Sequence, residues 1–514
     1  MKQYLRLTYL IIIATGLACT GSRRATGSKD DGKIEVVFVQ VNDVYEIAPL
    51  AGGKEGGMAR VATLKKQYQQ ANPNTFLVMA GDFLSPSVYN SLSYEGKRVR
   101  GRQMVDAMNA AGMDFVVFGN HEFDINETEL QDRINESGFQ WIASNTFHLV
   151  KGQTLPFEKT NISNPPPFPQ TFVLRVKDAD GTTAKVGFIG LTLPFNKANH
   201  VTYTDPIATA KTLYNALKDT VDAVVAITHQ LVDDDIRLAK EIPWLAAILG
   251  GHEHDMRLEK AGNVYITKAH ANAKSAYVVK LQINKKKRQT EVKPELKYLN
   301  ETFGLDRTTN EVVQKWVSIA DSNYASLGFN AKEVILQNSA PLDGREAEVR
   351  RGQTNLTALI TAAMAEACPQ ADIVLMNAGS IRVDDILLPP LTQYDIIRTL
   401  PFGGGIREVD MKGILLQRIL EAGRNNVNLG GYLQAQPVNY NAANRSWRVG
   451  NQPLDVYRTY RVAMSEFLLT GGETNLGFLT KDNPDIVKVY DAETGVDNPK
   501  ADLRLAVVKF LKKK

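Results

Sequence analysis

This sequence contains few cysteines and has a small net charge, and each of these properties excludes a class of protein. Of 514 residues only Cys19 and Cys368 are cysteines. If Cys19 is removed or lipidated, the mature chain has no internal disulfide, and we expect Cys368 to be a small buried apolar side chain. The formal net charge is only +4 and the basic clusters are short, so no nucleic acid polymer is indicated as a partner.

The N-terminal segment has the pattern of an export signal. Two basic residues precede the apolar stretch LTYLIIIATGLA, which is too short for a transmembrane helix. Ala18 before Cys19 resembles a bacterial lipoprotein cleavage site, although Gly16 stands where leucine is usual. We expect residues 1–19 to be a signal peptide of lipoprotein type, with simple secretion as the alternative, and residues 20–32 to be a flexible tether. The expected location is the periplasm or, through a lipid anchor, the outer membrane.

The length of the chain predicts two domains, because 514 residues exceed what one core usually holds. Runs such as IEVVFVQVND, MDFVVFGN and AAILGGHEH are almost continuously apolar, as is typical of strands buried on both faces. Amphipathic segments such as DPIATAKTLYNALKD lie between them, with Asp205 as a predicted helix N-cap. We predict a layered α/β domain over residues 33–300, closed by the antiparallel strands of AYVVKLQINKKKRQTEVKPELKYL.

The second half of the chain repeats this mixed character on a smaller scale. VVQKWVSIADSNYASLG predicts a helix that links the halves within residues 301–328. A second, smaller α/β or α+β domain is expected over residues 329–514, with strands ADIVLMN and YRVAMSEFLLT and helix NLTALITAAMAEA. The order of its strands does not follow from the sequence.

Polar side chains stand where the predicted strands end. The carboxyl ends of strands in open α/β sheets form the edge at which ligands bind, so groups from distant parts of the chain should converge there. Each one alone is more often a structural polar group than a ligand, but their ordered occurrence favours a site. The set consists of Asp43, Asp82, Asn120, His121, Asn145, His229, His252 and His254.

The chemistry of this set predicts a site for two divalent cations. Carboxylate, amide and imidazole ligands suit Mn²⁺, Zn²⁺, Fe²⁺ or Mg²⁺, and one carboxylate can bridge two ions. The absence of a thiolate argues against a structural zinc site. Two bridged cations activate water and offset the charge that develops on a phosphoryl group, which indicates hydrolysis of a phosphoester.

The ordered motifs ND, GD, GNHEFD, TH and GGHEH resemble those of the calcineurin-like metallophosphoesterases, and with the second half they resemble the 5′-nucleotidase family over roughly residues 34–505. The resemblance implies a layered α/β metallophosphoesterase sandwich, joined by a helix to a smaller α/β substrate-binding domain. It further implies that Asp82 bridges two metal ions. The other implied ligands are Asp43 and His254 at one site, and Asn120, His229 and His252 at the other.

The same resemblance gives His121 a catalytic role. It would face the scissile phosphate, with Asp124 as the partner that orients its ring. The alternative for Asp124 is a helix N-cap. The family pattern is broken at Tyr45, which stands where a histidine is usual. A neutral phenol is a poor ligand, so one metal site is expected to be weakened, or completed by Glu46 or water.

Gly-flanked polar turns in the second half resemble the family's nucleotide site. Without the resemblance, such turns are ordinary connections and a lone phenylalanine is ordinary core. Guanidinium groups suit phosphate because they form bidentate hydrogen bonds and stay charged. Glu473 stands where the family usually has an aspartate, so the contact with the ribose is expected to be shifted or changed. The residues implied to bind substrate are Arg350 with its neighbour Arg351, Asn377 and Arg382, the base-stacking Phe402 and Phe467, and Glu473.

The sequence therefore predicts an exported dimetal phosphohydrolase that releases phosphate from nucleotides. Two alternatives stay open. One is a related hydrolase of 2′,3′-cyclic nucleotides, nucleotide sugars or a sulfur-oxyanion intermediate. The other is a nucleotide-binding lipoprotein whose metal site has decayed through Tyr45. The sequence indicates no oligomeric state and no membrane contact beyond the N-terminal anchor.

Overall fold

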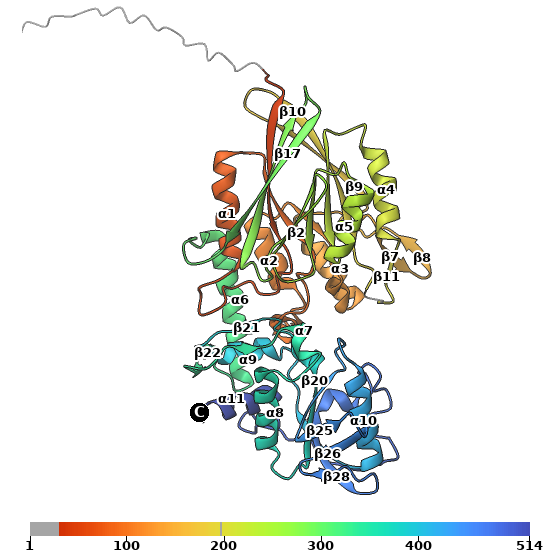
Figure 1. Cartoon of the computed structure of the whole chain (residues 1–514). Coiled ribbons are helices and arrows are strands. Elements are labelled where there is room, and N and C mark those ends of the chain that lie inside the picture. Colours follow the sequence, from red (N-terminus) through yellow and green to blue (C-terminus); the bar gives the residue numbers. More distant parts are fainter. Residues whose placement is uncertain (1–29, 196–197, 514) are drawn as a thin grey trace, which may run out of the picture.

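The computed structural model describes residues 30–195 and 198–513 (Figure 1). The predicted signal peptide, Cys19 and most of the predicted tether lie outside these residues. Within the described ranges, no helix combines the length and the apolar character needed to cross a membrane.

The first half of the chain contains two six-stranded sheets. One has the order β17-β16-β1-β2-β5-β6, and β1, β2, β5 and β6 run parallel. Its strands are β1 (Lys33–Val41), β2 (Thr75–Ala80), β5 (Phe115–Val117), β6 (Gln140–Trp141), β16 (Ser275–Asn284) and β17 (Gln289–Tyr298). The other has the order β14-β15-β13-β12-β10-β9, made of β9 (Thr171–Lys177), β10 (Thr183–Thr192), β12 (Ala223–His229), β13 (Ala247–Gly251), β14 (Arg257–Ala261) and β15 (Val264–Lys268).

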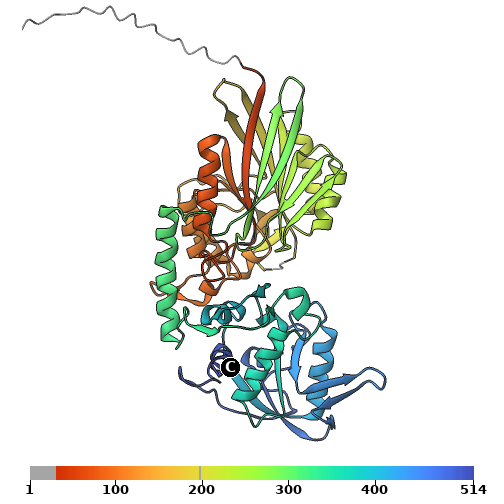
Figure 2. The ribbon, with the colours of Figure 1, turned by 60° about the vertical axis from the view of Figure 1, so that its left-hand side comes forward.

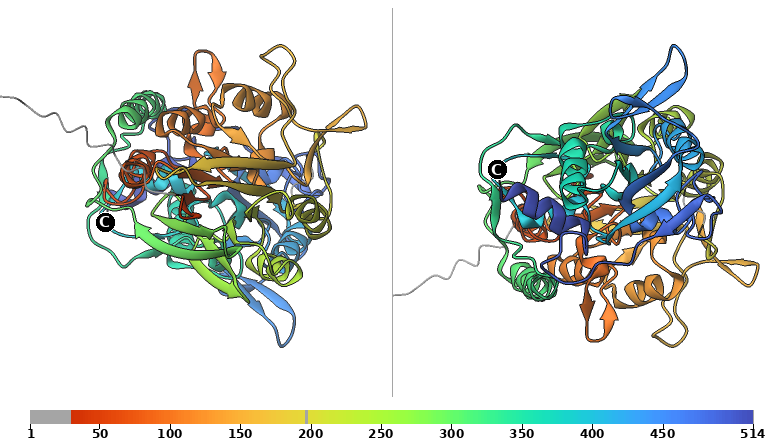
Figure 3. Two further views of the ribbon diagram at one scale, coloured as in Figure 1. Left: turned by 90° about the horizontal axis from the view of Figure 1, so that it is seen from above. Right: turned by 90° about the horizontal axis from the view of Figure 1, so that it is seen from below.

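The two sheets pack face to face with helices on both outer sides, which gives four layers (Figures 1 and 3). Alternation along β1 explains the arrangement, because Val36 and Phe38 face the other sheet while Val37 and Val39 face the helices. Phe38 meets Phe188 of β10 edge to face at 5.6 Å. The outer helices are α1 (Met58–Ala71), α2 (Arg102–Ala111) and α3 (Glu127–Glu136) on one side, and α4 (Pro206–Leu217) and α5 (Val232–Glu241) on the other.

The helix α6 (Arg307–Ser326) runs along both halves of the chain (Figure 2). Beyond it lies a five-stranded sheet of order β24-β20-β28-β23-β29, which the sequence did not reveal. Its strands are β20 (Ile373–Asn377), β23 (Ile406–Lys412), β24 (Leu433–Gln436), β28 (Thr459–Ser465) and β29 (Ile486–Val489). Helix α10 (Gly413–Asn425) covers one face, and α8 (Asn355–Ala367), α9 (Gln393–Thr399) and α11 (Leu503–Leu511) cover the other. The predicted two-domain α/β fold is confirmed.

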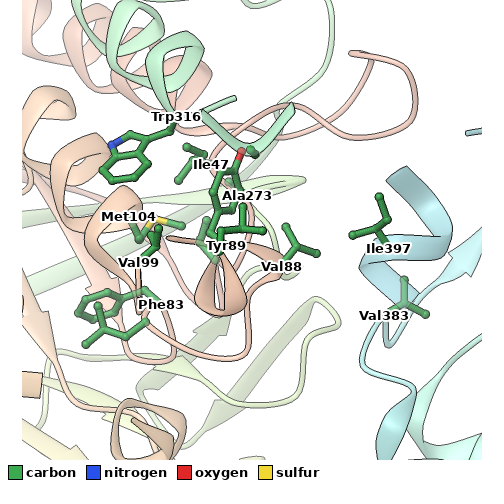
Figure 4. Close-up of a cluster of buried hydrophobic side chains, with 14 of the residues drawn as sticks. Ile47, Phe83, Val88, Tyr89, Val99, Met104, Ala273, Trp316, Val383 and Ile397 are labelled. Atoms are coloured by element: carbon green, nitrogen blue, oxygen red, sulfur yellow. The ribbon is translucent and has the colours of Figure 1, made fainter. Parts of the chain in front are cut away.

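One apolar cluster continues from the helical layer of the first domain into the second. Val88 of the first domain points toward Val383 and Ile397 of the second in Figure 4, and all three are buried. Trp316 of α6 belongs to the same cluster and is fully buried. The two domains therefore meet through side chains that are removed from water, which favours this arrangement.

Local predictions agree with the structure at two positions and are incomplete elsewhere. Asp205 caps α4 by accepting a hydrogen bond from the backbone N–H of Ala208 at 2.8 Å, and Cys368 is buried. Short elements were not anticipated. They are β3 (Ser93–Tyr94), β4 (Lys97–Arg98), β7 (Thr146–Val150), β8 (Gln153–Leu155), β11 (Val201–Tyr203), β18 (Val334–Leu336), β19 (Leu342–Asp343), α7 (Glu346–Val349), β21 (Ile386–Leu387), β22 (Leu391–Thr392), β25 (Val438–Asn441), β26 (Ser446–Val449), β27 (Gln452–Pro453) and the 3₁₀ turns η1 (Val88–Ser91), η2 (His121–Asp124), η3 (Ala378–Ser380) and η4 (Glu466–Leu469).

Candidate metal centre

Three buried side chains from three strand ends meet at one edge of the sandwich. Asp43 follows β1, Asp82 follows β2 and His229 ends β12. One ligand atom from each lies within 4.8 Å of the others. His229 Nε2 is 3.1 Å from Asp82 Oδ2 and 3.9 Å from Asp43 Oδ1. Parallel strands bring these residues together because their carboxyl ends share one edge.

His229 is oriented for metal binding by its own domain. Its Nδ1 lies 2.8 Å from the Ala80 carbonyl oxygen, which can only accept a hydrogen bond, so Nδ1 carries the proton and Nε2 faces the carboxylates. Burial opposes the charged form, but Asp82 and Asp43 raise the pKa of His229 to about 9. The two carboxylates thus favour a positive charge at this position. A divalent cation fits the donor set of two carboxylates and an imidazole.

His252 joins the same group through its backbone and its ring. Its N–H donates to Asp43 Oδ2 at 2.9 Å, and its ring meets that of His229 at 5.3 Å. Burial and the neighbouring His229 lower the pKa of His252 to about 4. The imidazole is therefore neutral at pH 7, which is the form that ligates metal.

The hydroxyl of Tyr45 lies among the predicted ligands of the second metal site, which is the site built on Asp43 and His254. The oxygen is 2.9 Å from His254 Nε2, 3.3 Å from Asp82 Oδ2 and 3.4 Å from Asp43 Oδ1. Burial, with the charges of Asp82 and Asp43, raises the pKa of Tyr45 well above its ordinary value, so the phenol is neutral here. Glu46 is directed elsewhere and accepts a hydrogen bond from Tyr394 of α9.

Asn120 and His121 lie at the start of η2. Asn120 is buried, and the backbone N–H of His121 donates to Asp82 Oδ1 at 2.8 Å. His121 Nδ1 is 2.6 Å from Asp124 Oδ2. Burial opposes the charged ring, but Asp82 and Asp124 raise the pKa of His121 above its ordinary value. Asn126 caps the helix that follows. Asp124 therefore lies beside His121 and is not a helix N-cap.

The backbone is held in unusual conformations at the strand ends. Asp43, Asp82, His252 and His254 have φ of 54°, 55°, 100° and 59°, in the left-handed region that disfavours side chains. Such strain clusters at functional sites, where the surrounding structure enforces it. A Cβ at Gly119 would lie 2.0 Å from Asp82 Oδ1, so the glycine of GNHEFD allows the close approach of the two loops.

Comparison with known proteins identifies the two halves separately. A family model described as calcineurin-like phosphoesterase matches residues 36–256, and one described as 5′-nucleotidase, C-terminal domain matches residues 334–480. The chain thus combines a calcineurin-like phosphoesterase domain with a 5′-nucleotidase C-terminal domain, in the order that the resemblance predicts. A trifunctional nucleotide phosphoesterase protein of Bacillus subtilis is 26% identical over 86% of this chain, and the match spans 32% of the length of that relative.

Solved structures share the fold of both domains. The structure of a 5′-nucleotidase precursor from Thermus thermophilus has a TM-score of 0.66 at 23% identity, covering 93% of this chain and 96% of the other. A sulfate thiohydrolase of Thermus has a TM-score of 0.62 at 15% identity, covering 93% and 94%. The fold is thus shared by proteins whose names point to different substrates, and the substrate must be argued from the site.

The C-terminal domain places one predicted substrate residue, Arg382, near the metal centre. Arg382 lies in a small cleft with Tyr45 and Arg398, and its charge acts on both Tyr45 and His121. Arg350 is held by Glu346 at 2.6 Å, and burial lowers its pKa. Arg351 is turned toward Asn428, to which its Nε donates at 2.6 Å.

The two rings predicted to stack on the base lie at the surface of the C-terminal domain. Phe402 and Phe467 are 64% and 43% exposed, so neither ring is the ordinary core side chain that the sequence left open. Asn377 Nδ2 donates to Glu473 Oε2 at 2.6 Å, which joins these two predicted residues. Asn145 has a structural place, with hydrogen bonds to the backbone of Thr192 at 2.9 Å.

Three polar groups around the centre were missed by sequence reasoning. Buried Glu122 accepts hydrogen bonds from the backbone N–H groups of Asp82, Phe83, Leu84 and Gly119, which fixes the loops that carry Asp82 and Asn120. Lys268 donates to the carbonyls of Gln230 at 2.6 Å and Gly251 at 2.8 Å, which adjoin His229 and His252. Asp384 of the C-terminal domain contacts His254 Nδ1. The position of Glu122 within the motif GNHE could have indicated it, whereas no pattern indicates a contact between domains.

Proposed function

We propose that this protein is an exported 5′-nucleotidase that releases phosphate from nucleotides with two divalent metal ions. The observation that carries the proposal is the position of Arg382 of the C-terminal domain, which shares a small cleft with Tyr45, whose hydroxyl contacts Asp43 and Asp82. A phosphoryl group bound there would meet fixed positive charge on the side opposite the metal ligands.

The two ions would be held as the family resemblance implies. Asp43 and His254 belong to one site, Asn120, His229 and His252 to the other, and Asp82 to both. Bound there, the ions supply an activated water and offset the charge on the phosphoryl oxygens. Mn²⁺, Zn²⁺, Fe²⁺ and Mg²⁺ all suit this set of carboxylate, amide and imidazole ligands.

The residues of the chain have separate tasks in this proposal. His121, oriented by Asp124, carries a proton near the phosphate and can pass it to the leaving oxygen. Arg350 and Arg382 bind and orient the phosphate, while Asn377 and Glu473 contact the ribose or base. Phe402 and Phe467 hold the base by stacking, for which their exposure supplies the free ring faces.

The domain limits and the export route are parts of the same proposal. The phosphoesterase domain would span residues 33–300, the linking helix 301–328 and the substrate domain 329–514. Lipidation at Cys19 would anchor the protein in the outer membrane. Growth with a labelled fatty acid should label the wild type and not the Cys19→Ala variant. If neither protein is labelled, the protein is secreted without a lipid anchor.

A substrate panel tests the reaction. The metal-reconstituted protein should release phosphate from AMP faster than from ADP, UDP-glucose or 2′,3′-cyclic AMP. Preference for one of the latter would favour the related hydrolases, and activity on a sulfur oxyanion alone would move the protein to another reaction class. Asp82→Asn removes charge from both ions and should abolish turnover in a folded protein. Substantial activity in a metal-loaded Asp82→Asn variant would contradict the dimetal assignment.

One observation supports a second candidate function, that of a nucleotide-binding protein without activity. The neutral hydroxyl of Tyr45 occupies a place where a metal ligand is expected. If the protein binds AMP but retains no metal and releases no phosphate, it is a nucleotide-binding lipoprotein.

A further inference from the structure

The two domains contact each other at a predicted metal ligand. Asp384 lies in the C-terminal domain, between η3 and β21, and its Oδ2 is hydrogen-bonded to His254 Nδ1 of the first domain. The other carboxylate oxygen, Oδ1, accepts a hydrogen bond from the backbone N–H of Glu346 at 2.6 Å. Asp384 is therefore fixed within its own domain while it reaches into the neighbouring one.

His254 differs in this respect from His229. The ring of His229 is fully buried, and a backbone carbonyl of its own domain holds its Nδ1. The side chain of His254 is 22% exposed, and the group on its Nδ1 comes from the other domain. A ligating histidine needs such a partner, because the hydrogen bond on one ring nitrogen sets the tautomer and the direction of the other nitrogen.

We propose that Asp384 is a positioning residue for the metal centre, supplied by the substrate-binding domain. It holds His254 with Nδ1–H toward the carboxylate and Nε2 toward Asp43, from which Nε2 is 3.5 Å away. The metal site on this side is then complete only when the second domain is in place. The inference rests on the proposed function for the existence of the metal centre, but the role of Asp384 can fail separately.

A reciprocal effect follows by thermodynamic linkage. If the closed arrangement of the domains strengthens metal binding, metal binding must favour the closed arrangement by the same factor. The feature therefore couples occupancy of the site built on Asp43 and His254 to the position of the domain that carries Arg382.

The chain offers a matched control in the next residue. Asp385 also bridges the domains, because its Oδ2 lies 2.5 Å from Lys274 Nζ. Neither partner of this ion pair is a predicted metal ligand. Asp385→Asn thus removes a charge and a contact between the domains, as Asp384→Asn does, but leaves His254 untouched.

The first experiment measures Mn²⁺ binding by electron paramagnetic resonance for the wild type and both variants. Asp384→Asn should lower the affinity for one of the two Mn²⁺ ions by about 10–100-fold, the usual effect of removing the hydrogen-bond partner of a metal ligand. Asp385→Asn should bind both ions like the wild type. Equal affinities in all three proteins would overturn the proposal, as would equal weakening in the two variants. A wild type that binds no Mn²⁺ would contradict the proposed metal centre itself.

The second experiment measures the reciprocal effect by small-angle X-ray scattering with and without Mn²⁺. Metal should shift the wild type and Asp385→Asn toward the compact form, and should shift Asp384→Asn less. Circular dichroism verifies that each variant is folded. A shift of equal size in Asp384→Asn would show that metal acts on the domains without this contact.

Discussion

At the scale of single residues, Tyr45 has the most direct effect on the chemistry that is expected. Its phenol must lose a proton to bind a divalent ion well, and its surroundings oppose that loss. We therefore expect the site built on Asp43 and His254 to be the weaker one, emptied first on dialysis and refilled by added Mn²⁺ or Mg²⁺.

Tyr45→His tests this expectation. The variant should hold the second ion more tightly and need less added metal, without a higher rate at saturating metal. Metal analysis after dialysis and activity against Mn²⁺ concentration provide the measurement. Two tightly held ions in the wild type, unchanged by the substitution, would show that the site is not weak. A coloured protein would instead indicate a ferric ion with Tyr45 as phenolate.

His121 is expected to act on the substrate and not on the metal. His121→Asn should lower kcat by about 10²–10⁴-fold, the usual worth of a general acid, with metal content unchanged. Loss of one ion on this substitution would make His121 a ligand.

The pH profile tests the partner of His121 separately. If His121 acts as a general acid, the rate falls as pH rises through the pKa of its ring, because the ring loses its proton. Asp124 raises that pKa. Asp124→Asn should therefore move the alkaline limb of the kcat profile to lower pH. An unmoved limb would mean that Asp124 has only a structural role.

The core of the candidate metal cluster could be anticipated at this scale, because strand ends carry the polar residues in a fixed order. The structure brings Asp43, Asp82 and His229 together as that order predicts. It could not be anticipated that Tyr45 points into the centre, since a sequence does not give the direction of a side chain. The partner of His254, from 130 positions later in the chain, was equally hidden.

At the scale of elements, the loops after α9 and β28 carry the two exposed rings. Phe402→Ala and Phe467→Ala should each lower kcat/KM for AMP by about 5–150-fold, if a stacked base contributes about 1–3 kcal/mol. A small aryl phosphate, which has no base, is the matched substrate and should be affected far less. Equal losses on both substrates would make the rings structural.

Strands and helices with strong patterns were predicted well, and short pieces were not. Continuous apolar runs such as β12 and the amphipathic α4 are set by burial alone. The two-residue strands and the 3₁₀ turns depend on contacts with distant segments, as η2 does through Asp82. The order of the C-terminal sheet has the same cause, because β20 pairs with β28 from far along the chain.

At the scale of the whole molecule, metal binding should stabilise the fold. A ligand at 100 times its Kd adds about 2.7 kcal/mol to the free energy of unfolding when only the folded state binds it. Removal of metal with a chelator should therefore lower the unfolding temperature, measured by calorimetry. Asp82→Asn should show little of this dependence, and a wild type that is insensitive to chelators would contradict the prediction unless its ions resist removal.

Strand β1 pairs with both β2 and β16, and this pairing determines when the metal centre can form during translation. When the ribosome has added α3, Asp43, Asp82 and Asn120 already exist, but β1 lacks one of its two neighbours until Ser275–Asn284 is made. His252 and His254 are also still to come. A nascent chain is thus unable to assemble the centre until more than half of its length has emerged, and metal capture is a late event in its biogenesis.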